Sequence, residues 1–221
     1  MEAAEPMPPV QEFASQAVRE TLGRSSDVDA CMALVSRING LLEQAAGQLA
    51  QGDAPLACRK GCSFCCHLTV MVMPHEAIAL FRYLQSRMPD ALAGPVRMRL
   101  RERAASPAAA PRACAFLVAG ECAAYEARPS ACAAYHSLSK ARCEQSFQNP
   151  ALPSGTVVLR SLQAVTAGLE DGVSAALAAQ GLSPVRMELH AAVAALLAKP
   201  ALIARWRAGR ALPATHPEEV A

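Results

Sequence analysis

The chain has 221 residues, a net charge of +2 and an apolar fraction of 52%, enough for one medium-sized domain with an appended helical lobe. The weak charge and the lack of a long basic run argue against nucleic-acid binding. No basic, apolar leader opens the chain and no uninterrupted apolar stretch of about 18 residues follows, so we expect no signal peptide, no membrane association and a cytoplasmic location.

The N-terminal part of the chain predicts a disordered start followed by two helices. Residues 1–10 are rich in proline and glutamate, and we expect them to be disordered. A short helix is expected over residues 11–22, and a longer one begins at Asp27, which suits an N-cap, and continues to about Ala50. Cys31 lies in its first turn and is expected to be a small buried residue rather than a metal ligand.

Four cysteines follow within nine residues, in the run Cys58-Arg-Lys-Gly-Cys62-Ser-Phe-Cys65-Cys66. Thiolates are soft ligands that select zinc, copper(I) and iron–sulfur clusters. A loop that carries several of them two or three residues apart can wrap around one centre. In a reducing cytosol such clustering favours metal over disulfides. The spacing therefore predicts a metal or cluster site, with Gly61 in a tight turn before Cys62.

Helices and a second group of cysteines come next. Residues 68–73 are expected to be extended or to open a buried segment, and helices are expected from Pro74 to about Met88 and over 95–105. The arginines between 97 and 103 are interpreted as a solvated helix face. We expect tertiary folding to bring the second group to the first, so the candidate ligands are Cys58, Cys62, Cys65, Cys66, Cys114, Cys122, Cys132 and Cys143.

The number of centres stays open at this point. Adjacent cysteines point in different directions, so Cys65 and Cys66 do not readily chelate one ion together. Either one of the two binds a second centre or lies outside the ligand shell as a supporting residue, or the two coordinate different atoms of a polynuclear cluster. Eight thiols equal two four-cysteine sites. His67 and His136 each follow a cysteine closely and are expected to support the site from outside the ligand set.

The cysteine pattern resembles the YkgJ-type cysteine-cluster family, also described by a CxxCxxCC motif and as a zinc- or iron-chelating domain. The resemblance covers about residues 55–145, and this chain departs from it by three residues between Cys58 and Cys62, by Ala115 in place of proline and by Ala133 in place of a basic residue. The matching elements are Cys58, Cys62, Cys65 and Cys66, then Cys114-Ala-Phe-Leu, then Cys122-Ala-Ala-Tyr125-Glu126-Ala-Arg128-Pro129 with Cys132.

The family likeness also implies what the site does. Some relatives carry the motif in flagellin lysine methylases, so the resemblance implies, by analogy, a redox or protein-modification role that involves a protein partner of unknown identity. Tyr125, Glu126, Arg128 and Pro129 are interpreted as shaping the turn that delivers the second cysteine group. His75 and Glu76 are interpreted as ordinary first-turn residues of a helix, and His190 as a residue at the surface or the edge of the core.

No cysteine follows residue 150, and helical patterns are expected over 156–180, 184–199 and 201–210, with Trp206 anchoring the last helix. The expected architecture is mostly α, with a cysteine-cluster domain at 11–150, a helical C-terminal lobe at 151–212 and a frayed tail at 213–221.

Iron–sulfur is favoured over zinc because vicinal cysteines and surplus thiols suit a polynuclear centre. Two functional classes follow. One is a redox or modifying enzyme, or its electron-transfer partner, and the other is a non-catalytic, zinc-stabilised interaction module. The pattern leaves enzymatic activity open.

Overall fold

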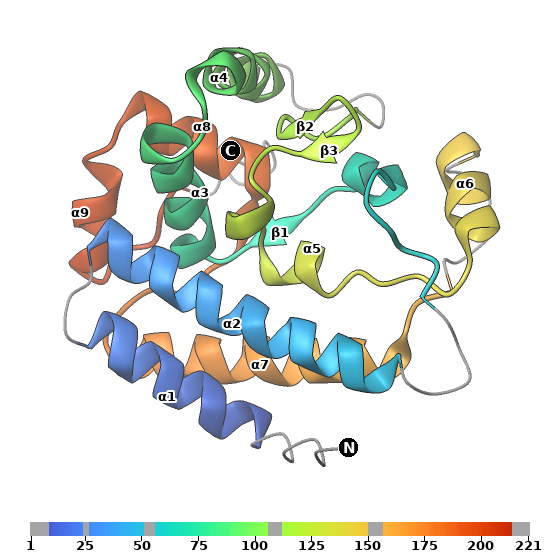
Figure 1. Ribbon diagram of the computed structural model, residues 1–221. Coiled ribbons are helices and arrows are strands. Elements are labelled where there is room, and N and C mark those ends of the chain that lie inside the picture. The colour runs from blue at the N-terminus through green and yellow to red at the C-terminus, as the bar shows by residue number, and fades with distance from the viewer. Residues whose placement is uncertain (1–8, 24–26, 51–55, 106–111, 150–156, 214–221) are drawn as a thin grey trace.

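The computed structural model describes residues 9–23, 27–50, 56–105, 112–149 and 157–213 and confirms a mostly α-helical fold (Figure 1). Residues 1–8 and 214–221, which hold most of the expected disordered start and frayed tail, lie outside the described residues. No helix in the described part of the chain is long and apolar enough to cross a membrane. The described α-helices are α1 (Val10–Leu22), α2 (Val28–Leu49), α3 (Pro74–Ser86), α4 (Asp90–Ala105), α5 (Ser130–Ala133), α6 (Lys140–Gln148), α7 (Arg160–Ala179), α8 (Leu189–Ala198) and α9 (Leu202–Arg207).

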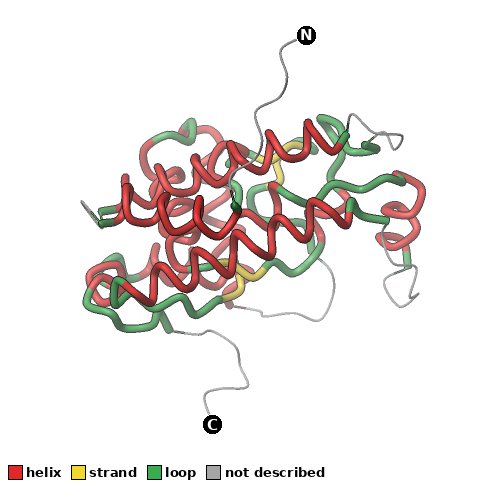
Figure 2. Tube along the Cα trace, turned by 90° about the horizontal axis from the view of Figure 1, so that it is seen from below, coloured by secondary structure: helices red, strands yellow, loops and turns green. Residues whose placement is uncertain are grey.

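Three long helices, α1, α2 and α7, run side by side and form one layer of the molecule (Figures 1 and 2). Asp27 caps α2 as expected, because its Oδ1 accepts a hydrogen bond from the Ala30 N–H at 2.8 Å. The backbones of α1 and α7 approach closely at Gly172, where an added Cβ would lie 2.8 Å from the Cβ of Ala14. The small residues at this crossing therefore set the spacing of the layer.

The helices α3, α4 and α8 form a second layer, in which α8 packs on both α3 and α4, and α3 packs on α2. Cys31 on α2 is fully buried, and burial raises the pKa of its thiol to about 12, which confirms the expectation of a small core residue. Trp206 on α9 is also fully buried, and its indole N–H donates to the Ser183 carbonyl at 2.8 Å, so its anchoring role is confirmed.

Two short antiparallel pairs fix the loops between the helices. β1 (Met71–Val72), within the segment expected to be extended, pairs with β4 (Met187–Glu188). β2 (Leu117–Val118) pairs with β3 (Glu121–Cys122) across a two-residue turn. Ala119 and Gly120 in that turn have φ values of 49° and 82°, the left-handed conformation that a tight hairpin turn requires. The pairing of β1 with β4 therefore connects the segment that follows Cys66 to the segment that leads into α8.

Candidate metal centre

The first cysteine group lies on two consecutive tight turns. Gly61 has a φ of 82°, and the Cys62 N–H donates to the Arg59 carbonyl at 3.0 Å, so the expected glycine turn before Cys62 is confirmed. A short 3-10 helix, η1 (Phe64–His67), then carries both Cys65 and Cys66. The side chains of these adjacent cysteines are hydrogen-bonded to each other.

The second cysteine group is joined directly to the first. The Cys114 N–H donates to the Cys66 carbonyl at 2.7 Å, although 48 positions separate these residues. Cys122 ends β3, and Cys132 lies on α5. The cysteine-bearing segments η1, β3, α5 and α6 therefore lie towards one side of the molecule, to the right in Figure 1.

Two arginines of α4 hold the second group in place. Arg99 donates to the Leu117 carbonyl at 2.6 Å, and Arg103 donates to the Ala113 carbonyl at 2.7 Å. The interpretation of this arginine run as a solvated face is incomplete for these two residues, because each guanidinium also donates to a backbone carbonyl near Cys114. These contacts attach α4 to both sides of Cys114.

Glu76 fastens the helix that carries Cys132. This side chain is buried, and its Oε1 accepts hydrogen bonds from both the N–H and the Oγ of Ser130, each at 2.8 Å. Its Oε2 accepts from the Met73 N–H at 2.8 Å. Glu76 is therefore more than the ordinary first-turn residue expected, because it ties the start of α3 to the start of α5.

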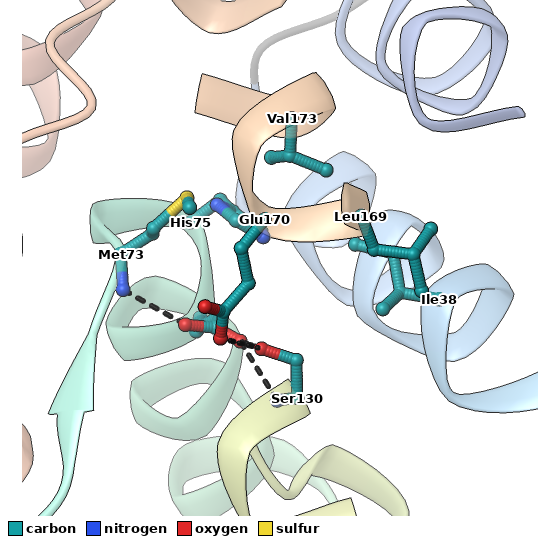
Figure 3. A pocket seen from close by; sticks show the side chains of 8 residues that line it. Ile38, Met73, His75, Ser130, Leu169, Glu170 and Val173 are labelled. Atoms are coloured by element: carbon teal, nitrogen blue, oxygen red, sulfur yellow. Dashed lines mark hydrogen bonds between the residues drawn. The ribbon is translucent and has the colours of Figure 1, made fainter. Parts of the chain in front are cut away.

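A small cavity, about 10 Å³ in volume and large enough for one water molecule, lies beside this clamp (Figure 3). His75 is buried there, and neither of its ring nitrogens has a hydrogen-bond partner among the described residues. The lining residues are Ile38, Met73, His75, Glu76, Ser130, Leu169, Glu170 and Val173.

The thiol of Cys58 is influenced by three neighbouring thiols. Burial raises the pKa of Cys58, the Ser137 N–H that donates to its Sγ at 3.2 Å opposes this rise, and the thiols of Cys62, Cys65 and Cys143 add to it. Cys143 is delivered by α6, whose N-cap Ser139 accepts from the Arg142 N–H. We call these four interacting thiols the first group, which consists of Cys58, Cys62, Cys65 and Cys143.

A second group of interacting thiols consists of Cys66, Cys114, Cys122 and Cys132. Burial raises the pKa of Cys114 to about 11 and also raises the pKa values of Cys122 and Cys132, with further contributions from the neighbouring thiols. Backbone N–H groups two residues ahead donate to two of these sulfurs, from Phe116 to Cys114 and from Ala124 to Cys122, and they lower the pKa of each. Such donors stabilise thiolates, the form that binds metal.

Cys65 connects the two groups. A hydrogen bond between the adjacent side chains lowers the pKa of Cys65 to about 7 and raises that of Cys66, so the pair shares one proton unequally. The positive charge of Arg128 also lowers the pKa of Cys65 and of Cys122. The Arg128 guanidinium itself lies 3.9 Å from the centroid of the Tyr125 ring and pairs with Glu43 at 3.2 Å.

These observations fit a soft metal or a cluster. All nine cysteines are free thiols, and the eight clustered ones lie in two electrostatically coupled groups. Partly buried thiols are costly to ionise without a cation, and a thiophilic metal supplies that cation. In the part of the chain that the structure describes, no group of three or more cysteine, histidine, aspartate or glutamate side chains is placed so that it could hold a metal ion. Whether each thiol is a ligand stays a prediction.

The histidines divide into those near the motif and one that sequence reasoning missed. His67 packs on Phe147 with ring centroids 4.5 Å apart, and its Nδ1 lies 3.2 Å from the Ser63 carbonyl oxygen. His136 is half-buried, and burial lowers its pKa. His190 is only 2% exposed, and its Nε2 lies 3.3 Å from the Cys114 Sγ. No spacing rule links His190 to a cysteine 76 positions away, so only the fold reveals this contact.

Comparison with known proteins is informative for the cysteine-rich segment. No curated protein and no solved structure matches this chain. Residues 57–151, less than half of the chain, match the model of the CxxCxxCC family, described as "Putative zinc- or iron-chelating domain". The matched segment contains all eight clustered cysteines and excludes α7, α8 and α9. The family resemblance that the cysteine spacing indicated is thus confirmed over this segment.

Proposed function

We propose that the clustered cysteines bind an iron–sulfur cluster and that the chain serves redox or protein-modification chemistry together with a protein partner. The observation that carries the proposal is the position of the Cys65–Cys66 pair. Cys65 interacts electrostatically with Cys58 and also with Cys122 and Cys132. Cys66 interacts with Cys65, Cys114 and Cys122, so the adjacent pair lies between the two groups of thiols. A polynuclear centre offers separate atoms to adjacent thiolates that cannot share one ion.

The surrounding residues suit such a centre. A bound cluster would supply one-electron transfer, and the chain would hold it, shield it and tune it. Burial of Cys114 and Cys132 limits water at the sulfurs, and backbone N–H groups directed at Cys114 and Cys122 offset thiolate charge. Arg128 adds a positive charge close to Cys65.

A second candidate is a zinc-stabilised interaction module. It is favoured by the small share of regular structure around most of the clustered cysteines, which lie on tight turns, a two-residue strand and a four-residue helix, with Cys143 alone on a longer helix. Structural zinc contributes on the order of 10 kcal/mol to the folding of such segments. In this case the metal organises the loops and takes no part in chemistry.

Anaerobic purification followed by metal and sulfide analysis tests both candidates. The iron–sulfur proposal predicts iron with acid-labile sulfide and visible absorption that bleaches on reduction. Zinc in simple ratio to the chain, without colour or sulfide, would support the interaction module instead. Anaerobically purified protein that contains neither iron nor zinc would contradict both candidates. A Cys31→Ser variant should contain the same amount of metal and sulfide as the native chain, because this buried thiol lies on α2, outside the clustered cysteines.

A further inference from the structure

We infer that the surface formed by η1, Leu68 and α6 is the docking surface for the protein partner and that it receives an acidic segment with an apolar anchor. The inference rests on the proposed function, because it names the chemistry of the partner proposed there. Cys65 on η1 and Cys143 on α6 belong to the clustered thiols, so a partner bound at this surface lies beside the candidate metal centre.

The rest of the fold covers little of α6. This helix lies at the edge of the molecule, to the right in Figure 1, and among the described elements it packs chiefly on η1. Cys143 is buried, whereas most other residues of α6 are exposed. One side of the helix therefore fixes it to the cysteine-bearing segment, and the remaining sides are accessible to another molecule.

An aromatic cluster lies where α6 meets η1. The centroid of the Phe147 ring lies 5.8 Å from that of Phe64 and 4.5 Å from that of His67. Phe147 is 42% exposed, and Leu68, the residue after η1, is 47% exposed. Single exposed apolar residues are ordinary, but two that adjoin one aromatic cluster are typical of a site where a partner inserts an apolar side chain.

Basic side chains lie at the other end of the docking surface. Lys140 and Arg142 are exposed in the first turn of α6, and Arg59 is exposed in the first turn of the cysteine-bearing segment. The segment that leads into α6 lies against this turn, because the Ser137 N–H donates to the Cys58 Sγ at 3.2 Å. None of these three cations forms an ion pair with a carboxylate of the described residues.

The charge of the chain is distributed unevenly. Residues 57–151 contain twelve basic and six acidic residues, a net charge of +6, whereas the remainder of the chain has a net charge of −4. Near the docking surface, Glu144 lies on α6 and Glu121 is already paired with Lys60 at 3.5 Å. A positive field attracts an acidic partner and speeds its association, while an apolar anchor supplies affinity.

Other anionic partners match the docking surface less well. A nucleic acid is usually bound along a continuous basic stripe, and a membrane by an amphipathic helix that inserts a broad apolar face. Here three cations flank one small aromatic cluster, and the apolar side of α6 already packs on η1. These proportions favour a protein segment in which acidic residues surround a phenylalanine or a leucine.

Peptide binding tests the inference without any assay of activity. The probe is a fluorescent synthetic peptide in which glutamates flank a phenylalanine and a leucine, and fluorescence anisotropy measures its affinity for the full chain. Hydrogen exchange of the complex should show new protection in η1, in α6 and in the turn at Arg59. The affinity should fall at least about tenfold between low and physiological ionic strength. The same peptide with lysine in place of glutamate should not bind.

Charge-reversal variants test the basic side chains. The test variant replaces the three cations of the docking surface: Arg59→Glu, Lys140→Glu and Arg142→Glu. The matched control makes the same change in charge at exposed arginines in and just after α9: Arg205→Glu, Arg207→Glu and Arg210→Glu. The test variant should bind the peptide at least about tenfold more weakly, and the control should bind it like the native chain.

A second pair of variants tests the apolar anchor site. Leu68→Ser should weaken peptide binding about threefold or more, because apolar contact area is lost. Met98→Ser is its control, because Met98 is 57% exposed on α4, away from the docking surface, and should bind the peptide like the native chain.

The outcomes separate this inference from the proposed function when metal content is measured in the same samples. Equal binding by the two charge-reversal variants, protection outside the docking surface, or tighter binding of phosphatidylserine vesicles or single-stranded DNA than of the peptide would overturn the inference. A chain that contains metal but binds no peptide would overturn it while metal binding stands. A chain without metal that binds the peptide at this surface would support the docking surface and contradict the proposed metal centre.

Discussion

Replacement of Glu76 by glutamine should destabilise the protein far more than an ordinary change near a helix start. The native carboxylate is 4% exposed and accepts three hydrogen bonds, each 2.8 Å long. A glutamine can place its oxygen toward Ser130, but its amide NH₂ then faces the Met73 N–H, so a donor meets a donor. Loss of one charged hydrogen bond and an unsatisfied buried N–H together cost about 2–4 kcal/mol.

Urea unfolding of metal-free protein provides the assay, because it separates the clamp from the contribution of metal binding. Glu76→Ala should cost more than Glu76→Gln, since it leaves donors on both α3 and α5 without a partner. Glu20→Gln is the matched control, because Glu20 pairs with Arg37 at the exposed surface and should change stability little. A free energy of unfolding for Glu76→Gln within about 0.5 kcal/mol of the native value would refute the stabilising role of these hydrogen bonds.

Three further predictions concern the core, the cavity and the ligands. Gly172→Ala should lower the free energy of unfolding by about 1–3 kcal/mol, measured by thermal unfolding, because the new Cβ would lie 2.8 Å from the Ala14 methyl group of α1. Gly168→Ala is the control and should be neutral or stabilising, because its Cβ would lie 3.5 Å from the nearest atom. Equal effects of the two substitutions would contradict the close packing of α1 on α7. Burial lowers the pKa of His75, so the unfolded chain binds a proton that the folded chain does not, and stability should decline as the pH falls below about 6.5, by at most ~1.4 kcal/mol per pH unit. His75→Leu should reduce this slope, and an unchanged slope would exclude His75 as its source. Cys143→Ser should lower metal content per chain while Cys31→Ser leaves it unchanged, and full occupancy in Cys143→Ser would remove that residue from the ligand set.

Local sequence patterns predicted the features that depend on near neighbours in the chain. The cap at Asp27, the turn at Gly61 and the burial of Cys31 each follow from a few adjacent residues, and each is confirmed. The mostly α-helical fold follows from apolar periodicity in the same way. The predicted start of the helix at Pro95 is wrong, because α4 begins at Asp90 and contains Pro95 in its interior.

Contacts between distant segments could not be predicted in this way. The hydrogen bonds from Arg99 to Leu117 and from Ser130 to Glu76 join residues 18 and 54 positions apart. The approach of His190 to Cys114 spans 76 positions. An arginine run on a helix, a glutamate in a first turn and a histidine among alanines look the same whether they face solvent or a buried loop. Tertiary packing decides which of these occurs.

Cysteine alkylation mapped by mass spectrometry tests the central claim most directly. Protein purified anaerobically is labelled under native conditions before and after treatment with a strong chelator. A shared metal centre predicts that Cys58, Cys62, Cys65, Cys66, Cys114, Cys122, Cys132 and Cys143 are protected at first and become labelled together when metal leaves. Cys31, buried in α2, should not change with them. Identical labelling of the eight thiols before and after chelation would contradict a metal centre at this site.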